Sequence, residues 1–294
     1  MDYRAITEQR AEHLEVALKS AIDEASGKAR ELSKVVATLS KLTKEATLES
    51  PDKVREQLRL LHKMELGPLG LEVKLGEWIR MIKEDQKQRL EVRRNTLTHE
   101  LISAAQSRGI ACSVLTSHPL ELSLTPLTVV VDFAANIAEL KYARLSLEKV
   151  AATPDEIIKA HKKSVERLKS GFAPERFSDV LRETYRTVCQ QRGVSYGDRV
   201  DLVALLAPLA LALQPNRFLS DPVAAHYRSY GRVRFAWDLA RLRQEGLLAR
   251  GGHRLSLGSA TGNTTKRKTD VLYIEDTMGK GQYYLTLWYT ANNS

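Results

Sequence analysis

The sequence of 294 residues contains only two cysteines, Cys112 and Cys189, and no uninterrupted apolar run of membrane-spanning length. Two cysteines exclude a disulfide-held scaffold and suit a reducing compartment, so we expect a cytoplasmic protein. The longest apolar stretch, residues 200–213, is broken by Asp201 and Pro208. It falls short of the roughly 20 residues that a helix needs to cross a bilayer. Because the first thirty residues carry acids and no apolar core, we expect neither a secretory signal nor a membrane partner.

Motifs of known catalytic centres are also scarce. The seven histidines do not cluster with cysteines or carboxylates at metal-ligand spacings. No strand is followed by a G-x-x-x-x-G-K-[ST] loop, and no serine or cysteine lies in a recognisable nucleophile motif. We therefore expect no metal and no cofactor. A non-enzymatic role is preferred, although the sequence leaves the enzyme question open.

Positive charge is what the sequence has in excess, and it is unevenly distributed. The chain has 45 Lys+Arg against 36 Asp+Glu, a net charge of +9. Residues 1–109 contain 20 basic and 18 acidic residues, residues 110–214 contain 13 and 12, and residues 215–294 contain 12 and 6. Two-thirds of the excess thus lies in the last segment, which favours a polyanionic partner there.

Residues 1–109 have the pattern of a helical stalk. From Ala11 onward, nine of ten heptad positions are apolar, with Lys28 as the exception, which is typical of a coiled coil or a long bundle. A second helix is predicted to begin at Ser50-Pro51, and a third to span residues 71–107. Such helices can dock a protein partner or a second copy of the chain. The two heptad series are Ala11, Leu18, Ala25, Leu32, Leu39 and Leu14, Ala21, Lys28, Val35, Leu42.

Residues 110–150 change to short segments that are rich in alternating apolar and β-branched residues. They predict a small β element, with strands at 110–115, 120–124, 127–133 and 137–143, and with Pro119 and Pro126 at the boundaries.

Within this β element, the order Asp132, then Glu139-Leu140-Lys141 resembles the core of the PD-(D/E)xK nucleases. The resemblance implies that Asp132 and Glu139 would hold Mg²⁺ while Lys141 positions the attacking water. The match covers about ten residues, and its spacing is shorter than that family usually shows. The preferred interpretation is a hairpin with Asp132 at its turn and with Glu139 and Lys141 on a solvated face.

Residues 151–214 are expected to form a helical connector. Thr153-Pro154-Asp155-Glu156 is a helix start with a capping box, and a further helix is predicted from Pro174 to about Arg192. The run from Leu202 onward is apolar on nearly every side, which predicts a buried helix.

Residues 215–294 carry the most informative pattern. A short helix at 221–227, a turn at Ser229-Tyr230-Gly231, a helix at 232–245 and a glycine turn before a strand follow one another. This succession, with Glu-Gly-Leu-Leu at 245–248, resembles a winged helix-turn-helix over about 45 residues. The resemblance implies that the second helix enters the major groove of double-stranded DNA and that the following hairpin forms a wing.

The same segment supplies the candidate nucleic-acid-binding residues. Four arginines lie on the second predicted helix, one on the predicted wing, and three cations in a loop that is rich in hydroxyls, which can follow a phosphate backbone. They are Arg232, Arg234, Arg241, Arg243, Arg254, Lys266, Arg267 and Lys268.

Together these patterns predict a mostly helical α+β protein with a stalk at 1–109, a β element at 110–150, a connector at 151–214 and a winged-helix-like basic module at 215–294. The preferred function is a non-enzymatic DNA-binding or adaptor subunit of a larger complex, assembled through the stalk. A metal-dependent nuclease using Asp132, Glu139 and Lys141 is the first alternative. A purely structural protein–protein scaffold is the second.

Overall fold

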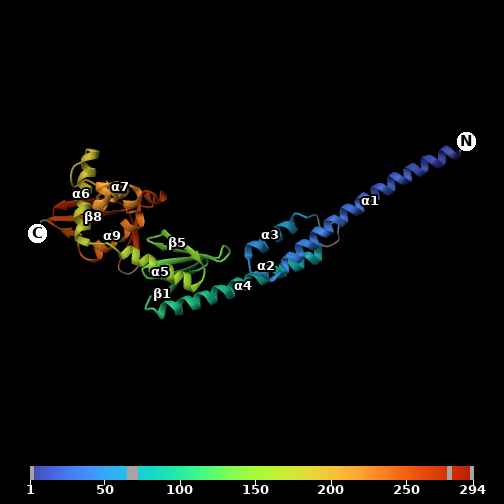
Figure 1. Ribbon diagram of the computed structural model, residues 1–294, viewed down its shortest axis with the longest axis horizontal. Helices are drawn as coiled ribbons and strands as arrows, with labels where there is room; N and C mark the ends of the chain where they lie inside the picture. The colour runs from blue at the N-terminus through green and yellow to red at the C-terminus, as the bar shows by residue number, and fades with distance from the viewer. Residues whose placement is uncertain (1–2, 65–71, 277–279, 292–294) are drawn as a thin grey trace. The chain divides into compact units, whose positions relative to one another are not determined.

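The computed structural model describes residues 3–64, 72–276 and 280–291, and its fold is α+β with antiparallel sheets, as predicted (Figure 1). The contacts divide the chain into two compact units. The helical unit consists of Met1–Thr96 with Phe133–Ala135, and the sheet unit of Leu97–Asp132 with Asn136–Ser294. The predicted segments 110–150, 151–214 and 215–294 therefore lie almost wholly within one unit. None of the described helices has both the length and the apolarity of a membrane span.

The helical unit is built from α1 (Tyr3–Leu42), α2 (Glu45–Leu48), α3 (Pro51–His62) and the first part of α4 (Glu72–Gln106). The predicted helix start at Ser50-Pro51 and the predicted helix at 71–107 agree closely with α3 and α4, although residue 71 lies outside the described residues, and α2 was not predicted. Pro51 occupies the first turn of α3, as expected, while the Ser50 side chain makes no capping hydrogen bond. Helices α1, α3 and α4 bury a common core of Val35, Leu42, Val54, Leu58, Leu61, Leu75 and Ile79.

The heptad positions of α1 fall into two groups. Val35 and Leu42, near its C-terminal end, are 2% and 0% exposed in the core of the helical unit. Leu14 and Leu18, near its N-terminal end, are 64% and 63% exposed. The apolar series thus continues beyond the part of α1 that the chain itself covers.

The first sheet of the sheet unit is a five-stranded antiparallel meander in the order β1-β2-β3-β4-β5. Its alternating side chains bury Leu122, Val129 and Leu140 on one face, where α5 (Pro154–Lys169) packs against β4 and β5. The four predicted strands are present and a fifth follows them. The strands are β1 (Cys112–Ser117), β2 (Leu120–Leu124), β3 (Leu127–Asp132), β4 (Ile137–Tyr142) and β5 (Leu145–Ala151).

The second sheet has the order β6-β10-β8-β7, with β9 paired to β10 on the same edge as β6. Three helices pack with it: α6 (Pro174–Arg192), α7 (Leu202–Ala212) and α9 (Arg232–Gln244). We call its two faces the inner face, which buries Leu255, Leu272, Tyr284, Leu287 and Tyr289, and the outer face. The strands are β6 (Val200–Asp201), β7 (Ala249–Arg250), β8 (His253–Ser259), β9 (Leu272–Glu275) and β10 (Gly281–Ala291).

The segment before α9 differs from the predicted helix at 221–227. The structure has α8 (Asn216–Ser220) and then a three-residue 3₁₀ turn, Ala224–His226. Asp221 is extended, with φ −146° and ψ 92°. The ring of Pro222 disfavours helical backbone at the residue before it, which explains why the helix ends there.

Helix α9 forms where it was predicted, but it is buried on nearly every side. Phe235, Ala236, Trp237, Asp238, Leu239, Ala240 and Leu242 are all buried. The ring of Trp237 packs edge-on against Tyr142 of β4, with 5.0 Å between ring centroids. The helix therefore lies within the core of the sheet unit, which leaves its middle turns no free face for a DNA groove.

Candidate nucleic-acid interface

Aromatic rings and cations alternate on the outer face of the second sheet. Tyr273 of β9 lies directly across from Tyr283 of β10, and Trp288 of β10 lies across from Ser256 of β8. Directly paired residues of antiparallel strands point to the same side, so Tyr273 and Tyr283 share a face. The irregular pairing between Tyr284 and Thr286 shifts the alternation along β10 by one residue, so Trp288 lies on this same outer face. Arg254, paired with Thr290, follows on this face and is exposed.

Each of these rings carries a cation. The Arg144 guanidinium lies over the rings of Tyr273 and Tyr283, at 4.6 and 5.6 Å from their centroids. Lys268 Nζ lies 4.6 Å from the Tyr283 centroid and donates a 3.0 Å hydrogen bond to its hydroxyl. Such stacking holds positive charge in fixed places on the sheet.

At the other end of the outer face, the Arg199 guanidinium lies 4.6 Å from the centroid of the Trp288 ring. Cations therefore cover both ends of the face.

Arg144 reaches this face from an unusual turn between β4 and β5. Ala143 and Arg144 have φ values of 50° and 63°. Left-handed backbone at two consecutive residues other than glycine is strained, at a cost of about 1–2 kcal/mol each. The Ala143 N–H donates to Glu275 Oε1 at 3.0 Å, and this bond together with the stacking of Arg144 holds the turn. The strained turn is therefore the one that places the Arg144 guanidinium on the outer face.

Two titrating groups lie beside Arg144. Burial raises the pKa of Glu275 to about 7; the nearby Asp276 adds to this shift, while the Ala143 N–H and Arg144 oppose it. Burial also acts to raise the pKa of Tyr283, but the hydrogen bonds and charges of Lys268 and Arg144 outweigh it and leave that pKa below its ordinary value. Glu275 is thus partly neutral near pH 7.

The predicted basic loop borders the outer face. Lys266, Arg267 and Lys268 are exposed, as a phosphate-contacting loop requires. The loop is nevertheless anchored, because the Arg232 guanidinium donates to the backbone carbonyls of Lys268, Thr269 and Val271. The Arg232 side chain thus anchors the loop, whereas the winged-helix resemblance implied that it would point from α9 toward DNA.

The other arginines of α9 also have partners within the chain. Arg234 Nε pairs with Asp238, and its terminal nitrogens donate to the carbonyls of Arg167 and Ser170 at 2.9 Å each. Arg241 pairs with Glu245 at 2.6 Å. Arg243 is exposed and donates to the Tyr284 hydroxyl at 3.2 Å. The arginines of α9 thus form their hydrogen bonds and ion pairs within the chain.

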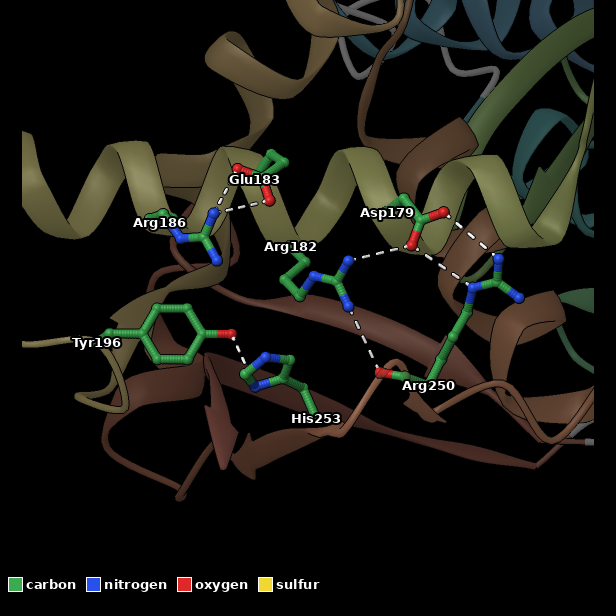
Figure 2. Close-up of polar contacts among 7 residues, drawn as sticks. All are labelled: Asp179, Arg182, Glu183, Arg186, Tyr196, Arg250 and His253. Atoms are coloured by element: carbon green, nitrogen blue, oxygen red, sulfur yellow. Dashed lines mark hydrogen bonds and ion pairs between the residues drawn. The ribbon is translucent and has the colours of Figure 1, made fainter. Parts of the chain in front are cut away.

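The hairpin β7–β8, predicted as a wing, is tied to α6 (Figure 2). Arg250 Nη2 lies 3.4 Å from Asp179 Oδ2, and Arg182 Nη1 donates to the Arg250 carbonyl at 3.5 Å. The Tyr196 hydroxyl is 3.4 Å from His253 Nδ1. Among the described residues Arg254 has no recorded partner, and it remains the predicted wing residue that is free to meet a ligand.

The nuclease-like residues share one face of the first sheet without forming a metal cluster. Glu139 pairs across the strands with Val130, and Asp132 with Ile137, so the two acids are diagonal neighbours, with Cβ atoms roughly 7 Å apart. Lys141 Nζ lies 3.0 Å from Glu139 Oε2. Burial acts to raise the pKa of Glu139, but Ser146, Lys141 and Lys149 lower it below the ordinary value. In the described part of the chain, no three His, Cys, Asp or Glu side chains are placed to hold a metal ion.

Searches against protein-family models, curated proteins and solved structures give no match to this chain.

Of the residues that carry the outer face, the sequence singled out Lys268 but not the three rings or the arginines stacked on them. Tyr283 and Trp288 lie in β10, and assigning their faces requires knowing the irregular pairing between Tyr284 and Thr286. Arg144 and Arg199 lie outside the basic segment. A signal was nonetheless present, because aromatic residues make up only 6% of the chain and five of them fall on the adjacent strands β9 and β10.

Proposed function

We propose that the protein is a non-enzymatic nucleic-acid-binding subunit that contacts the phosphate backbone through the outer face of the second sheet. The observation that carries the proposal is the pairing of Tyr273, Tyr283 and Trp288 with Arg144, Lys268 and Arg199. Interleaved cations and aromatic rings on a sheet are how many proteins hold nucleic acids, because phosphates meet the cations and bases stack on the rings.

The charge on this surface supports the proposal. Beside the three stacked cations it carries Arg254, Lys266 and Arg267, all exposed. One of its acids, Asp201, is offset by Arg192 at 3.4 Å, and burial raises the pKa of another, Glu275, to about 7, so that Glu275 carries less than a full negative charge near pH 7. The local excess of positive charge therefore exceeds what residue counts alone indicate.

The arrangement favours single strands over duplex. Bases of a single strand can stack on a ring or on a guanidinium plane, whereas paired bases are not accessible. The buried middle turns of α9 do not favour recognition through the major groove. The winged-helix resemblance implied double-stranded DNA as the partner, so the experiment described below tests a duplex beside the single strand.

The adaptor part of the proposal rests on α1. Its exposed heptad positions, including Leu14, Leu18 and Leu32, continue a seam that Val35 and Leu42 complete inside the helical unit. A seam with a period of seven residues is matched by another helix of the same period, so we assign a second copy of the chain as its partner. Self-association would bring several nucleic-acid-binding faces into one assembly.

The test is a fluorescence-anisotropy titration of the full chain with a labelled single strand and with the matching duplex, across a range of salt concentrations. The variant Lys266→Glu/Arg267→Glu removes two exposed cations at the edge of the face. If each contacts a phosphate, the slope of log K against log salt becomes shallower by about 2.

A matched control carries the same change in charge elsewhere. Lys162 and Lys169 are exposed on α5, away from the outer face, so Lys162→Glu/Lys169→Glu should leave the slope close to that of the wild type. Equal losses in both double variants would show that net charge alone attracts the nucleic acid. No binding of either form at low salt would refute the proposal, and tighter binding of duplex would refute the preference for single strands.

A further inference from the structure

A cavity of about 770 Å³ lies in the sheet unit where four helix ends meet: the end of α5, the start of α6, the end of α7 and the start of α9. Its volume is that of a site for a ligand of drug or nucleotide size. None of the residues that line it belongs to the aromatic and cationic set of the outer face.

Five arginines line this cavity, together with one acid, Asp238. Arg234 pairs with Asp238, and Arg232 donates to backbone carbonyls. The remaining three have no carboxylate partner among the described residues; they are Arg167, Arg176 and Arg228. Guanidinium groups present planar pairs of donors that match phosphate oxygens. The cavity is therefore strongly electropositive.

The position of Arg228 is built into the fold. The side chain of Gln214, which is 2% exposed, accepts the Arg228 N–H at 2.8 Å and donates to the Arg228 carbonyl at 2.9 Å. Gly171, with φ +69°, leaves room for the guanidinium: a Cβ there would lie 2.6 Å from Arg228 Nη2. A buried amide and a glycine thus hold this arginine at the cavity wall.

The start of α9 adds a second positive element. Gly231, in extended conformation, precedes Arg232 at the first position of this 13-residue helix, and both line the cavity. The first N–H groups of a helix have no partner within the helix and carry about half a positive charge. Helix starts of this kind bind phosphate in many proteins.

Part of the remaining wall is apolar. Phe172, Leu213, Pro215 and Val233 contribute flat or aliphatic surface beside the arginines. A ligand that fits this lining has a polyanionic end and a flat, weakly polar end.

We infer that this cavity binds a nucleotide carrying two or more phosphates, with the polyphosphate against Arg167, Arg176, Arg228 and the start of α9. This inference does not depend on the proposed nucleic-acid function, since it uses different residues.

The experiment is isothermal titration of the full chain with ATP and, separately, with inorganic tripolyphosphate. Arg176→Glu reverses one exposed cavity charge and should weaken ATP binding by about tenfold or more. The matched control is Arg217→Glu, an exposed arginine on α8 that does not line the cavity, and it should change the affinity by less than about twofold. Gly171→Ala alters no charge; by displacing Arg228 it should also weaken ATP binding.

Each outcome bears on the inference. Tighter binding of ATP than of tripolyphosphate supports a nucleotide, and equal binding refutes the nucleotide while leaving a polyphosphate. No binding of either probe, or equal losses in Arg176→Glu and Arg217→Glu, overturns the site. The variant Lys266→Glu/Arg267→Glu should bind ATP as the wild type does, so failure of the nucleic-acid proposal and failure of this one are separable.

Discussion

Asp238 of α9 is a buried acid whose ionisation should destabilise the fold at neutral pH. Its side chain is buried, with Arg234 Nε 3.0 Å from Oδ1 and the Tyr230 hydroxyl donating to Oδ2 at 3.0 Å. Burial raises the pKa of Asp238 to about 6, although Arg234 and Tyr230 act to lower it. Loss of solvation thus outweighs the two partners.

The magnitude follows from the difference between folded and unfolded pKa. The ordinary value is 3.8 and the folded value about 6, and each unit corresponds to roughly 1.4 kcal/mol. Because the folded pKa is the higher one, the folded state holds the proton more tightly. Stability from this group is therefore full below about pH 4, is lost as the pH rises, and has fallen by about 3 kcal/mol above about pH 6.

The perturbation is Asp238→Asn, which keeps the shape and an acceptor for Tyr230 but cannot ionise. As the pH rises from about 4 to about 7.5, the free energy of unfolding of the wild type should fall by about 3 kcal/mol relative to that of the variant. Urea unfolding in a Trp78→Phe background measures this, because the remaining tryptophans, Trp237 and Trp288, both lie in the sheet unit.

The control is Asp155→Asn, which removes an exposed acid from the first turn of α5. Its free energy of unfolding should follow the wild-type pH profile apart from a small, nearly constant offset. If Asp238→Asn differs from the wild type by the same amount at every pH, Asp238 is not a buried, destabilising carboxylate and the reasoning fails.

Two further predictions concern the outer face and α1. Glu275, with its pKa raised to about 7, gains a negative charge beside Arg144 as the pH rises, so nucleic-acid affinity should fall between about pH 6 and about pH 8 in the wild type and fall less in Glu275→Gln. Anisotropy at the two pH values measures this, and equal declines would contradict it. Leu18→Lys on the α1 seam should convert the assembly to monomer in light scattering, whereas Val16→Lys, 65% exposed on the opposite side, should not; an oligomer that survives Leu18→Lys would contradict the seam.

Elements with strong periodicity could be predicted from the sequence. Helix α3 begins at Pro51 and buries Val54, Leu58 and Leu61, at the spacing of one helix face. Strands β2 and β3 alternate buried and half-buried side chains, as their sequences indicate. In these segments local preference and burial agree, so no long-range information is needed.

The strained turn between β4 and β5 could not be predicted in this way. Hairpin turns with positive φ at both central residues usually contain Asn or Gly, and this one contains Ala143 and Arg144. What holds it is Glu275, which lies more than a hundred residues later in the sequence. A turn held by distant groups leaves no local signal.

The candidate site was predicted only in part for a related reason. The basic segment was correctly counted, but a count does not show which cations have partners inside the protein. Arg232 and Arg234 donate to backbone carbonyls, which are uncharged and occur at every residue. The positions of acidic residues in the sequence therefore cannot show which arginines donate to backbone carbonyls. Lys266 and Arg267 remain exposed because their loop lies at the surface.

Arg232 physically connects the two basic regions of the sheet unit. It lines the cavity at the start of α9, and its guanidinium holds the backbone of Lys268, Thr269 and Val271. Lys268, in turn, stacks on Tyr283 of the outer face. Burial lowers the pKa of Arg232, although Asp270 opposes the shift; a poorly solvated guanidinium gains more from an additional anionic partner than an exposed one does. Any rearrangement of Arg232 toward an anion in the cavity must therefore loosen the loop that presents Lys268.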